Sequence, residues 1–490
     1  MSATEPGNSS YDVLIIGAGA VGENVADRAG RTGLRVAIIE SELVGGECSY
    51  WACMPSKALL RPGAVLAAAR AVDGARQAVT GSLDQAAVLR RRDRIASDWD
   101  DGSQVAWLDG AGIDLIRGRA RFTAPRTVEV AGDDGPARVL VARHVVVVAT
   151  GSDAVVPEIP GLAESEPWTS REATSVQDVP ASLAIIGGGV VAVEMATAFA
   201  DLGTQVTVLV RGDRLLGGTE PFAGRAVAAA LAARGVDLRL STGVTRVVRD
   251  DHGVRLTLGD GGTVMAEQVL VATGRRPRSA DLGLETIGLE PGAPLVVDDF
   301  QQVVQVADGW LYATGDVTGR VATTHQGKYD ARIAGDVIAA RFGPRGDPAV
   351  VRDAPAWSRF RATADHGAVP QVVFSRPEVA SVGLTEAAAR AAGHPVRSVE
   401  VPLSSAAGAT VAADGDDGRP GYEGTASFVV DTERDVLLGA TFVGPDVAEM
   451  LHAATIAVVA EVPMHRLWHA VPAYPTVSEV WLRLMEAYGL

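Results

Sequence analysis

Residues 11–40 read YDVLIIGAGAVGENVADRAGRTGLRVAIIE, and this stretch decides the fold. An apolar run leads through a glycine-rich turn into an amphipathic segment and a second apolar run that ends at Glu40. In such a βαβ unit Gly17 permits the tight turn, Gly19 lets a pyrophosphate approach the backbone, and Gly22 lets helix and strand pack closely. Glu40 follows Gly22 by eighteen residues, where a carboxylate can accept hydrogen bonds from ribose hydroxyls. The stretch therefore predicts a dinucleotide-binding unit.

The same pattern occurs a second time in residues 182–211, SLAIIGGGVVAVEMATAFADLGTQVTVLVR. Its turn keeps Gly187 and Gly189 but has alanine at the third glycine position. The second strand ends with Val210 where a carboxylate would stand, and Arg211 follows. A guanidinium pairs with a ribose 2′-phosphate, whereas a carboxylate would repel it. The second unit is therefore predicted to prefer NADPH to NADH; the alternative is that Arg211 only belongs to a solvated loop.

Further repeats support two nucleotide-binding domains. The segments HVVVVATGS (144–152) and QVLVATGRR (268–276) are both buried strands that run into Ala-Thr-Gly. A further strand, GWLYATGDV (309–317), runs into Gly-Asp.

At about 150 residues per domain, the chain length of 490 residues predicts roughly three domains. After a Pro- and Gly-rich linker (341–356), strand patterns at 371–383 and 425–443 precede helices at 446–461 and 476–488, which predicts a third, α+β domain.

The composition of the chain argues against nucleic acid and membranes as partners. The formal charge is −16 and no basic block occurs, which argues against nucleic acid or an anionic membrane surface. No stretch approaches the ~18 uninterrupted apolar residues of a membrane span. The first twelve residues are polar, so no secretory signal is expected and the predicted location is the cytoplasm.

Both cysteines of the chain lie in residues 45–57, GGECSYWACMPSK. Two thiolates without a nearby histidine cannot complete a tetrahedral metal site, so no metal is predicted. On an ideal helix, residues five apart have Cα atoms roughly 8–9 Å apart, whereas a disulfide needs less than about 7 Å. If Cys48 and Cys53 bridge, the helix start must be distorted, and a strained small-loop disulfide is the reducible kind. The alternative is two cysteines packed as small hydrophobic residues.

This segment resembles the GG-x-C-x4-C-x-P-S-K signature of the class I pyridine nucleotide–disulfide oxidoreductases, which include dihydrolipoamide dehydrogenase, glutathione reductase and mercuric reductase. The resemblance extends to both βαβ units, both Ala-Thr-Gly strands, LYATGD (311–316) and PQVVFSRPEVASVGLTE (370–386). It implies an α/β fold with two Rossmann-like domains, for FAD and NAD(P)H, and a C-terminal α+β dimerisation domain. The implied boundaries are 1–155 and 281–350 for the two parts of the FAD domain, 156–280 for the NAD(P)H domain and 351–490 for the interface domain.

The resemblance also implies residue roles. Cys53 would face the flavin, Cys48 would attack the substrate, and Lys57 would pair with Glu194 near the flavin. Ala120 would lie on the adenine and Asp316 would bond the ribityl chain. The implied cofactor-binding residues are Gly17, Gly19, Gly22, Glu40, Ala120, Thr150, Gly151, Gly315 and Asp316 for FAD, and Gly187, Gly189, Arg211 and Gly274 for NAD(P)H.

One motif departs from the family. Disulfide reductases of this kind end in His-Pro-x-x-x-Glu, which acts across a homodimer, whereas this chain has AYPTVSE (473–479). Tyr474 therefore takes the histidine position while Glu479 remains. A phenol of unperturbed pKa ~10 is a poor base near neutral pH. His469 is an alternative base, or an ordinary surface histidine.

Two further features leave open which enzyme type within the family the chain resembles and how its redox cysteines are reached. The chain lacks the C-terminal cysteines of mercuric reductases, yet it keeps the cysteine pair that soluble transhydrogenases lack. Tyr50 and Trp51 inside the redox segment either alter access to the cysteines or pack against the core.

The resemblance thus implies an FAD-containing homodimeric oxidoreductase, acting on a sulfur group of donors with NAD(P) as acceptor. Electrons would pass from NADPH through the flavin to Cys48–Cys53 and on to a small or protein-borne disulfide. The alternative acceptor is a quinone, a metal ion or another non-disulfide oxidant, because such an acceptor needs no proton for a thiol leaving group. A flavin-bound sensor or structural dimer without turnover is a third interpretation.

Overall fold

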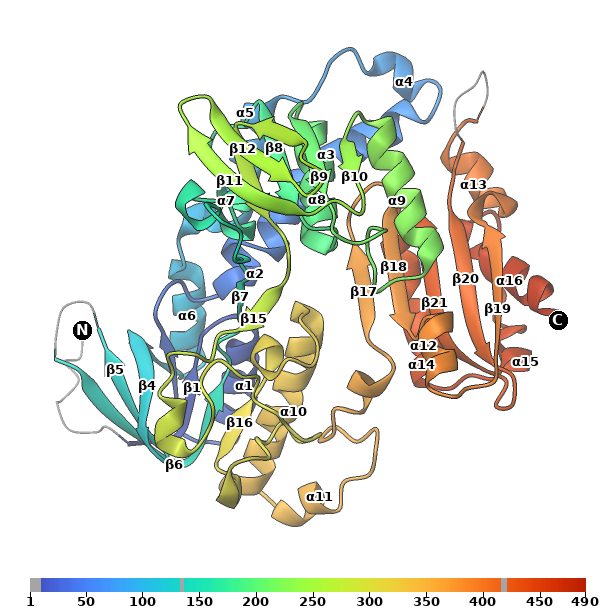
Figure 1. Cartoon of the computed structure of the whole chain (residues 1–490). Coiled ribbons are helices and arrows are strands. Elements are labelled where there is room, and N and C mark those ends of the chain that lie inside the picture. Colours follow the sequence, from blue (N-terminus) through green and yellow to red (C-terminus); the bar gives the residue numbers. More distant parts are fainter. Residues whose placement is uncertain (1–9, 133–135, 416–420) are drawn as a thin grey trace. The chain divides into compact units, whose positions relative to one another are not determined.

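The computed structural model describes residues 10–132, 136–415 and 421–490. The N-terminal segment 1–9, which contributed to the expectation of no secretory signal, lies outside the described residues. The chain divides into two compact units (Figure 1). The first unit is Met1–Met54, Asp93–Asp153 and Arg275–His366, and the second is Pro55–Arg92, Ala154–Gly274 and Gly367–Leu490.

The first unit contains the predicted βαβ element. Strand β1 (Ser10–Ile16), helix α1 (Ala20–Gly30) and strand β2 (Val36–Glu40) follow in order, and β1 pairs with β2 in parallel. They belong to a seven-stranded sheet of order β3-β2-β1-β6-β5-β4, with β16 paired to β6. Its other strands are β3 (Asp114–Arg117), β4 (Arg119–Ala124), β5 (Thr127–Ala131), β6 (Arg138–Val148) and β16 (Leu311–Ala313). The α/β fold predicted from the sequence is confirmed.

Helix α10 (Thr324–Phe342) packs closely on α1 because glycines face the contact. A Cβ on Gly335 would lie 2.3 Å from Cβ of Arg28, and one on Gly327 would lie 2.7 Å from Cγ2 of Val21. Both helices bury apolar residues against the sheet, in a cluster that includes Val13, Ile15, Val25, Ile38, Val147, Ala334 and Val337. The N-terminal turn of α10 is thereby held beside the glycine turn that precedes α1.

The remaining helical elements of the first unit are short. They include α2 (Gly46–Tyr50), α6 (Gly102–Gly110), η5 (Gly315–Thr318) and α11 (Pro348–Arg352). The predicted linker at 341–356 therefore contains the last two residues of α10 and the short helix α11.

The second unit contains the repeated βαβ element. Strand β8 (Ser182–Ile186), helix α8 (Val190–Asp201) and strand β9 (Gln205–Leu209) follow in order, and the two strands belong to a parallel sheet of order β10-β9-β8-β14. The sheet is completed by β10 (Asp237–Arg239) and β14 (Gln268–Val271), and α9 (Pro221–Ala233) precedes β10. An antiparallel three-stranded sheet, β11 (Val244–Asp250), β12 (Gly253–Leu258) and β13 (Thr263–Ala266), is inserted before β14.

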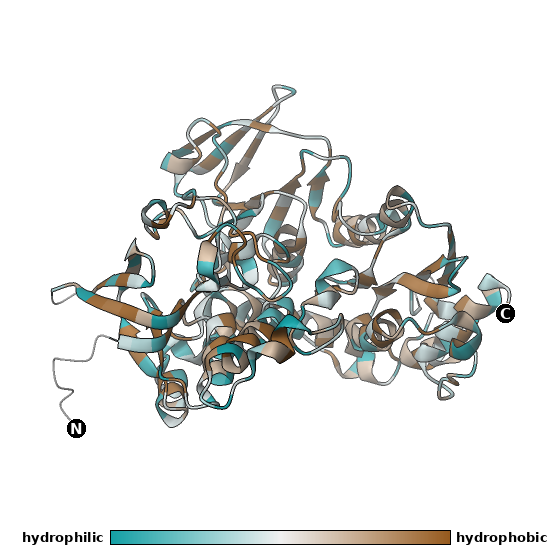
Figure 2. Cartoon of the chain, turned by 90° about the horizontal axis from the view of Figure 1, so that it is seen from below, coloured by the Kyte–Doolittle hydropathy of each residue, from teal (hydrophilic) through white to brown (hydrophobic). Residues whose placement is uncertain are grey.

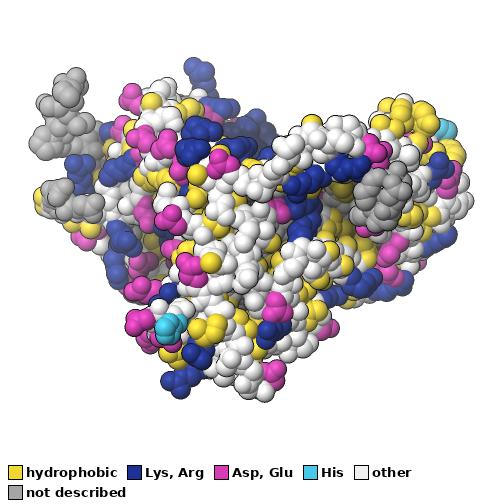
Figure 3. Space-filling model, turned by 90° about the horizontal axis from the view of Figure 1, so that it is seen from above, with side chains coloured by type: hydrophobic (Ala, Val, Ile, Leu, Met, Phe, Trp, Pro, Cys, Tyr) yellow, Lys and Arg dark blue, Asp and Glu magenta, His cyan; other side chains and the backbone are white. Residues whose placement is uncertain are grey.

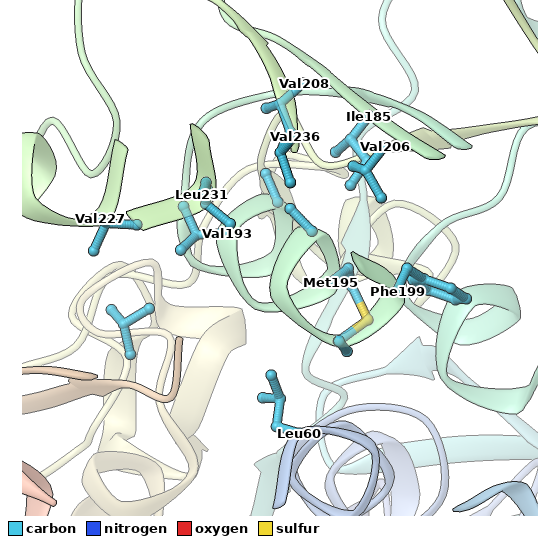
Figure 4. Packing of buried hydrophobic residues seen from close by; sticks show 14 of the residues in the cluster. Leu60, Ile185, Val193, Met195, Phe199, Val206, Val208, Val227, Leu231 and Val236 are labelled. Carbon is cyan, nitrogen blue, oxygen red and sulfur yellow. The ribbon is translucent and has the colours of Figure 1, made fainter. Parts of the chain in front are cut away.

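Helix α8 is buried on nearly all sides, which explains its almost entirely apolar sequence. Ile185, Val206 and Val208 of the sheet cover one side, and Met195 points towards Leu60 of helix α3 (Cys53–Arg70) on the other (Figure 4). This packing fixes the part of α3 within the second unit against α8.

The C-terminal part is the predicted α+β region. A five-stranded antiparallel sheet has the order β17-β18-β21-β20-β19, and helices α14 (Leu451–Val459) and α16 (Val480–Tyr488) pack on it. Its strands are β17 (Pro370–Val373), β18 (Glu378–Gly383), β19 (Val396–Pro402), β20 (Thr425–Asp431) and β21 (Val436–Gly444). The predicted strand regions 371–383 and 425–443 and both predicted helix regions are confirmed.

Hydropathy follows this architecture. Hydrophobic residues are concentrated along strands and the inner faces of helices, while many connecting turns are hydrophilic (Figure 2). Among the described residues, no helix combines the length and apolar character needed to cross a bilayer.

Candidate active site

The first glycine turn forms an open cradle. Gly17 has φ +103°, and a Cβ on Gly22 would lie 1.9 Å from the carbonyl oxygen of Gly17, so both positions require glycine. A Cβ on Gly19 would meet no atom within 4 Å. The backbone is thus exposed at Gly19, at the N-terminus of α1, where a pyrophosphate fits.

Glu40 is fixed at the end of β2 by the backbone. Its Oε2 accepts a hydrogen bond from Ala18 N at 2.7 Å, and its Oε1 accepts one from Glu42 N at 2.8 Å. Each carboxylate oxygen retains a second lone pair. The carboxylate is therefore orientated and still able to accept hydrogen bonds from a ribose.

A polar network connects Asp316 with the redox segment. Ser152 Oγ donates to Asp316 Oδ2 at 2.6 Å, and Arg275 Nε donates to Ser152 Oγ at 2.7 Å. The guanidinium groups of Arg275 and Arg278 lie 4.0 and 3.7 Å from the Glu47 carboxylate, directly before Cys48 in the chain. All these residues belong to the first unit. The network holds the Gly-Asp turn and the redox segment in a common framework.

The other predicted cofactor-binding residues of this unit are Ala120, Thr150, Gly151 and Gly315, all with small side chains or none. Ala120 on β4 is buried, and Thr150 Oγ1 donates to the carbonyl oxygen of Arg278 at 2.7 Å. Gly151 and Gly315 both have φ +75°, which favours glycine. A Cβ on Gly151 would meet nothing within 4 Å.

The cysteines lie on two helices separated by a break. Cys48 is in α2, Trp51 departs from helical geometry with φ −136° and ψ 0°, and Cys53 begins α3. The distortion that a bridge between the two residues would require is therefore present. Both are half-buried and in the thiol form, and the hydrogen bond to Cys53, with burial, raises the pKa of Cys48 well above its ordinary value. The two sulfurs thus lie within interaction distance.

The redox segment is attached to the glycine cradle. Gly45 N donates to the Ala18 carbonyl oxygen at 2.7 Å, and Gly45 has φ +113°. A Cβ on Gly46 would lie 2.9 Å from Cα of Gly19. The Gly-Gly pair before the first cysteine is thus required for close approach of the two backbone segments.

The two aromatic side chains of the redox segment, Tyr50 and Trp51, differ in burial. Tyr50 is 1% exposed and its hydroxyl donates to the Val44 carbonyl oxygen at 3.0 Å, so it packs in the core. Trp51 is half-buried and packs edge-on against Tyr50, with ring centroids 5.6 Å apart. For Tyr50, the alternative of packing against the core therefore applies.

Lys57 and Glu194 form the predicted pair in the second unit. Lys57 Nζ lies 2.8 Å from Glu194 Oε2, and the Glu194 side chain is 4% exposed. Phe374 N donates to Glu194 Oε1 at 2.9 Å, and the Lys57 ammonium lies 5.0 Å from the centre of the Phe374 ring. A buried carboxylate with two donors thus orientates a half-buried ammonium.

The second glycine turn has the same open form. Gly187 has φ +134° and a Cβ there would lie 2.2 Å from the Ala272 carbonyl oxygen, whereas one on Gly189 would meet nothing within 4 Å. Gly274 also has a positive φ, +137°, with open space at its Cβ position. Arg211 is exposed directly after β9 and the buried Val210.

The C-terminal motif lies on an exposed apolar segment. Tyr474 is 77% exposed and Val471 85%, and Trp468 is also exposed. Glu479 is buried and its Oε2 accepts from Ala407 N at 3.2 Å. His469 is exposed. An exposed apolar segment of this kind is suited to a protein contact.

The model of the pyridine nucleotide-disulphide oxidoreductase family matches residues 11–331, and the model of its dimerisation domain matches residues 369–485. The chain belongs to this family.

Its relatives include enzymes named for different substrates. Mercuric reductase from Staphylococcus aureus is 31% identical over 96% of this chain and 81% of its own length. Dihydrolipoyl dehydrogenase 3 from Pseudomonas aeruginosa is 32% identical over 98% of both chains. A solved structure, the Cu(II) complex of the HOCl-induced flavoprotein disulfide reductase RclA from Escherichia coli, superposes with a TM-score of 0.81 at 26% identity, covering 97% of this chain and 99% of that one.

Family membership makes the protein a flavoprotein oxidoreductase that uses FAD, a pyridine nucleotide and a redox disulfide, and the dimerisation domain supports a homodimer. The glycine cradle, Glu40 and the Asp316 turn fit FAD, because they offer exposed backbone and orientated acceptors. No group of three or more potential metal-ligating side chains occurs within the described part of the chain.

Several site residues were not identified from the sequence. Thr324 Oγ1, in the first turn of α10, lies 3.1 Å from Cys53 Sγ. Ser152, Arg275 and Arg278 form the network around Asp316 and Glu47. In the sequence, the arginines of this network form the run RRPR (275–278), and Glu47 directly precedes Cys48, but no local pattern links the two segments.

Proposed function

We propose that the protein transfers electrons from NADPH through bound FAD to the Cys48–Cys53 pair, and from there to a disulfide acceptor. The observation that carries this proposal is the broken helix between the two cysteines, which brings both sulfurs within interaction distance. Core packing alone requires neither this break nor the attachment to the glycine cradle. A reactive cysteine pair of this type suits a reducing compartment such as the cytoplasm.

The residues of the first unit would hold the flavin. The exposed backbone at Gly19 would bind the pyrophosphate, Glu40 the adenosine ribose, and Asp316, orientated by Ser152, the ribityl hydroxyls. FAD, when bound, supplies reversible two-electron transfer between a nicotinamide and a disulfide.

Lys57 and Glu194 would stabilise negative charge during turnover. Lys57 follows Cys53 by four residues on α3, so both residues lie on the same face of that helix. The buried Glu194 carboxylate fixes the position of the ammonium. A cation held in this way favours any step in which negative charge accumulates beside it.

One turnover reduces the Cys48–Cys53 bond and then re-forms it at the expense of the acceptor disulfide. Two electrons from NADPH break the Cys48–Cys53 bond and leave two sulfurs that share one proton, with Cys48 as thiol and Cys53 as thiolate. Cys48 loses its proton, attacks the acceptor disulfide and releases one thiolate. Cys53 then attacks Cys48 in the mixed disulfide, which re-forms the internal bond and releases the second thiolate.

The donor would be NADPH. Arg211 is exposed and follows Val210, whose Cγ1 would lie 2.7 Å from a Cβ on Gly188 in the glycine turn. A guanidinium in this place can pair with a ribose 2′-phosphate, whereas a carboxylate would select NADH.

A second candidate is reduction of a metal ion or a quinone. Tyr474 favours it, because thiol–disulfide exchange requires a base that accepts and returns a proton, and a phenol is in general a poor base near neutral pH. The relative named mercuric reductase and the Cu(II) complex of the Escherichia coli neighbour point in the same direction.

NADPH oxidation by the purified holoenzyme tests the proposal. Wild type and Cys48→Ser are compared with small disulfides, quinones and Cu(II) or Hg(II) as acceptors. Turnover of disulfides that Cys48→Ser abolishes supports thiol exchange. Turnover of quinones or metal ions alone, unaffected by Cys48→Ser, contradicts it and favours the second candidate; absence of turnover with every acceptor favours a sensor or a structural dimer.

A further inference from the structure

A left-handed turn lies next to the redox segment. Ser97, Asp98 and Trp99, which form the short element η1 (Ser97–Trp99), have positive φ angles of 52°, 50° and 56°. The left-handed region is unfavourable for L-residues, and residues other than glycine normally enter it one at a time. A run of such residues is therefore a strained backbone, which persists only where the surrounding structure determines it.

The side chains of Ser97 and Asp98 do not account for this strain. Both residues are exposed, and charged side chains are spread over the surface of the protein, as on the face drawn in Figure 3. An exposed polar side chain is solvated equally well on a right-handed turn, so solvation gains nothing from the positive φ angles. Trp99, in contrast, is half-buried. The conformation of the turn is therefore explained by what Trp99 contacts.

Trp99 contacts the redox segment through its indole. Its Nε1 donates to the carbonyl oxygen of Tyr50 at 3.2 Å. In a continuous helix this carbonyl would accept from Met54 N, four residues further on. The break at Trp51, with φ −136° and ψ 0°, interrupts that pattern, and α3 begins only at Cys53. The indole thus replaces the helical donor at the break between the two cysteines.

The residues after the turn contact the same segment at further points. Asp101 Oδ2 accepts from Val44 N at 2.7 Å, directly before the Gly-Gly pair. Gln104 Nε2 donates to Ser49 Oγ at 3.4 Å. Residues 99–104 thus hold the redox segment on both sides of its first cysteine.

We propose that Trp99 is a positioning residue of the redox pair. The left-handed turn directs its indole to the Tyr50 carbonyl, and this contact stabilises the helix break that the Cys48–Cys53 bond requires. A disulfide needs Cα atoms less than about 7 Å apart, closer than a continuous helix places residues five apart. The dithiol has no such requirement, so the contact favours the disulfide form. The inference rests on the proposed function, because it concerns the bond that the relay forms and breaks.

The test measures the redox equilibrium of the cysteine pair. Holoenzyme is equilibrated anaerobically in graded mixtures of reduced and oxidised dithiothreitol, alkylated with iodoacetamide and analysed by mass spectrometry for Cys48 and Cys53. The Cys48–Cys53 bond is reduced as dithiothreitol closes its own disulfide, and the two thiol protons of dithiothreitol pass to the cysteines or to solvent.

Trp99→Phe keeps an aromatic ring and removes the donor. It should shift the equilibrium about two- to tenfold towards the dithiol, as expected for the loss of one hydrogen bond. Trp107→Phe is the matched control, because Trp107 on α6 is 45% exposed, and it should leave the equilibrium unchanged.

Two variants of Asp98 separate the turn from the indole. Glycine adopts the left-handed region without strain, so Asp98→Gly should behave as wild type. A β-branched residue is strongly disfavoured there, so Asp98→Val should open the turn and shift the equilibrium in the same direction as Trp99→Phe. Both variants remove the same exposed charge, and they decide the question even if Trp99→Phe does not fold.

An unchanged equilibrium in Trp99→Phe, an equal shift in Trp107→Phe, or equal behaviour of the two Asp98 variants would overturn the inference. The exchange with dithiothreitol needs neither NADPH nor an acceptor. Failure of the proposed function would therefore appear in the turnover panel and leave these equilibria unaffected.

Discussion

The hydroxyl of Thr324 lies 3.1 Å from the sulfur of Cys53, although 271 residues separate them in the chain. The contact places the N-terminal turn of the nineteen-residue helix α10 at the redox pair. A hydroxyl donor and the positive end of a helix both stabilise a thiolate. The structure thereby places a polar side chain and a helix N-terminus beside Cys53, the sulfur proposed to carry the thiolate.

Replacing Thr324 by valine should shift the redox equilibrium of the cysteine pair towards the disulfide. A hydrogen bond to a charged group contributes about 1.5–3 kcal/mol, so the shift is about tenfold or more in equilibrium constant. Equilibration in graded dithiothreitol buffers, followed by alkylation, measures it. Thr324→Ser retains the hydroxyl and should behave as wild type; equal behaviour of Val and Ser variants would show that the contact has no energetic role.

The Lys57–Glu194 pair should be strongly coupled in stability. Glu194→Gln weakens both hydrogen bonds of the buried carboxylate, and the expected loss is about 1–3 kcal/mol in the free energy of unfolding. Lys57→Met should cost more, because it leaves a buried carboxylate with only the Phe374 amide as donor. Urea unfolding of both single variants and the double variant gives the coupling. Additive losses would contradict a direct pair.

Gly46→Ala should weaken flavin retention. The new Cβ would lie 2.9 Å from Cα of Gly19, and φ +60° is unfavourable for alanine. The redox segment would have to move off the cradle, at a strain of about 1–3 kcal/mol. The ratio of flavin to protein absorbance in the purified protein reports the loss. Gly81→Ala is the control, since its Cβ would meet nothing within 4 Å, and a normal ratio in both variants would count against the close approach.

Glu23 should make stability depend on pH. Burial raises its pKa from 4.5 to about 7, so the folded state binds this proton more tightly than the unfolded state. The resulting stabilisation is complete below about pH 4.5 and is lost as pH rises to about 7, by about 1–3 kcal/mol. Urea midpoints of wild type and Glu23→Gln at pH 5 and pH 8 measure the difference. The Gln variant should lose less stability over this interval; identical slopes would assign the pH dependence to other groups.

Sequence patterns predicted the elements with strong local signals. Both βαβ units follow from apolar periodicity and glycine turns. The break between Cys48 and Cys53 was predicted only on the condition that the two cysteines bridge. The pairing of Lys57 with Glu194 came from the family resemblance, because 137 residues separate them. Thr324 and the Arg275–Glu47 contact could not be predicted, since tertiary packing alone brings these segments together. The aromatic doublet was ambiguous, because burial of Tyr50 depends on the same packing.

The most direct test of the central claim is the appearance of cysteine thiols on addition of NADPH. The oxidised holoenzyme is incubated anaerobically with NADPH, alkylated with iodoacetamide and analysed by mass spectrometry for Cys48 and Cys53. The account predicts that both cysteines are protected before NADPH is added and both are modified afterwards. Flavin bleaching by NADPH while both cysteines stay unmodified would show that electrons bypass the pair, and the relay proposed for Cys48 and Cys53 would be wrong.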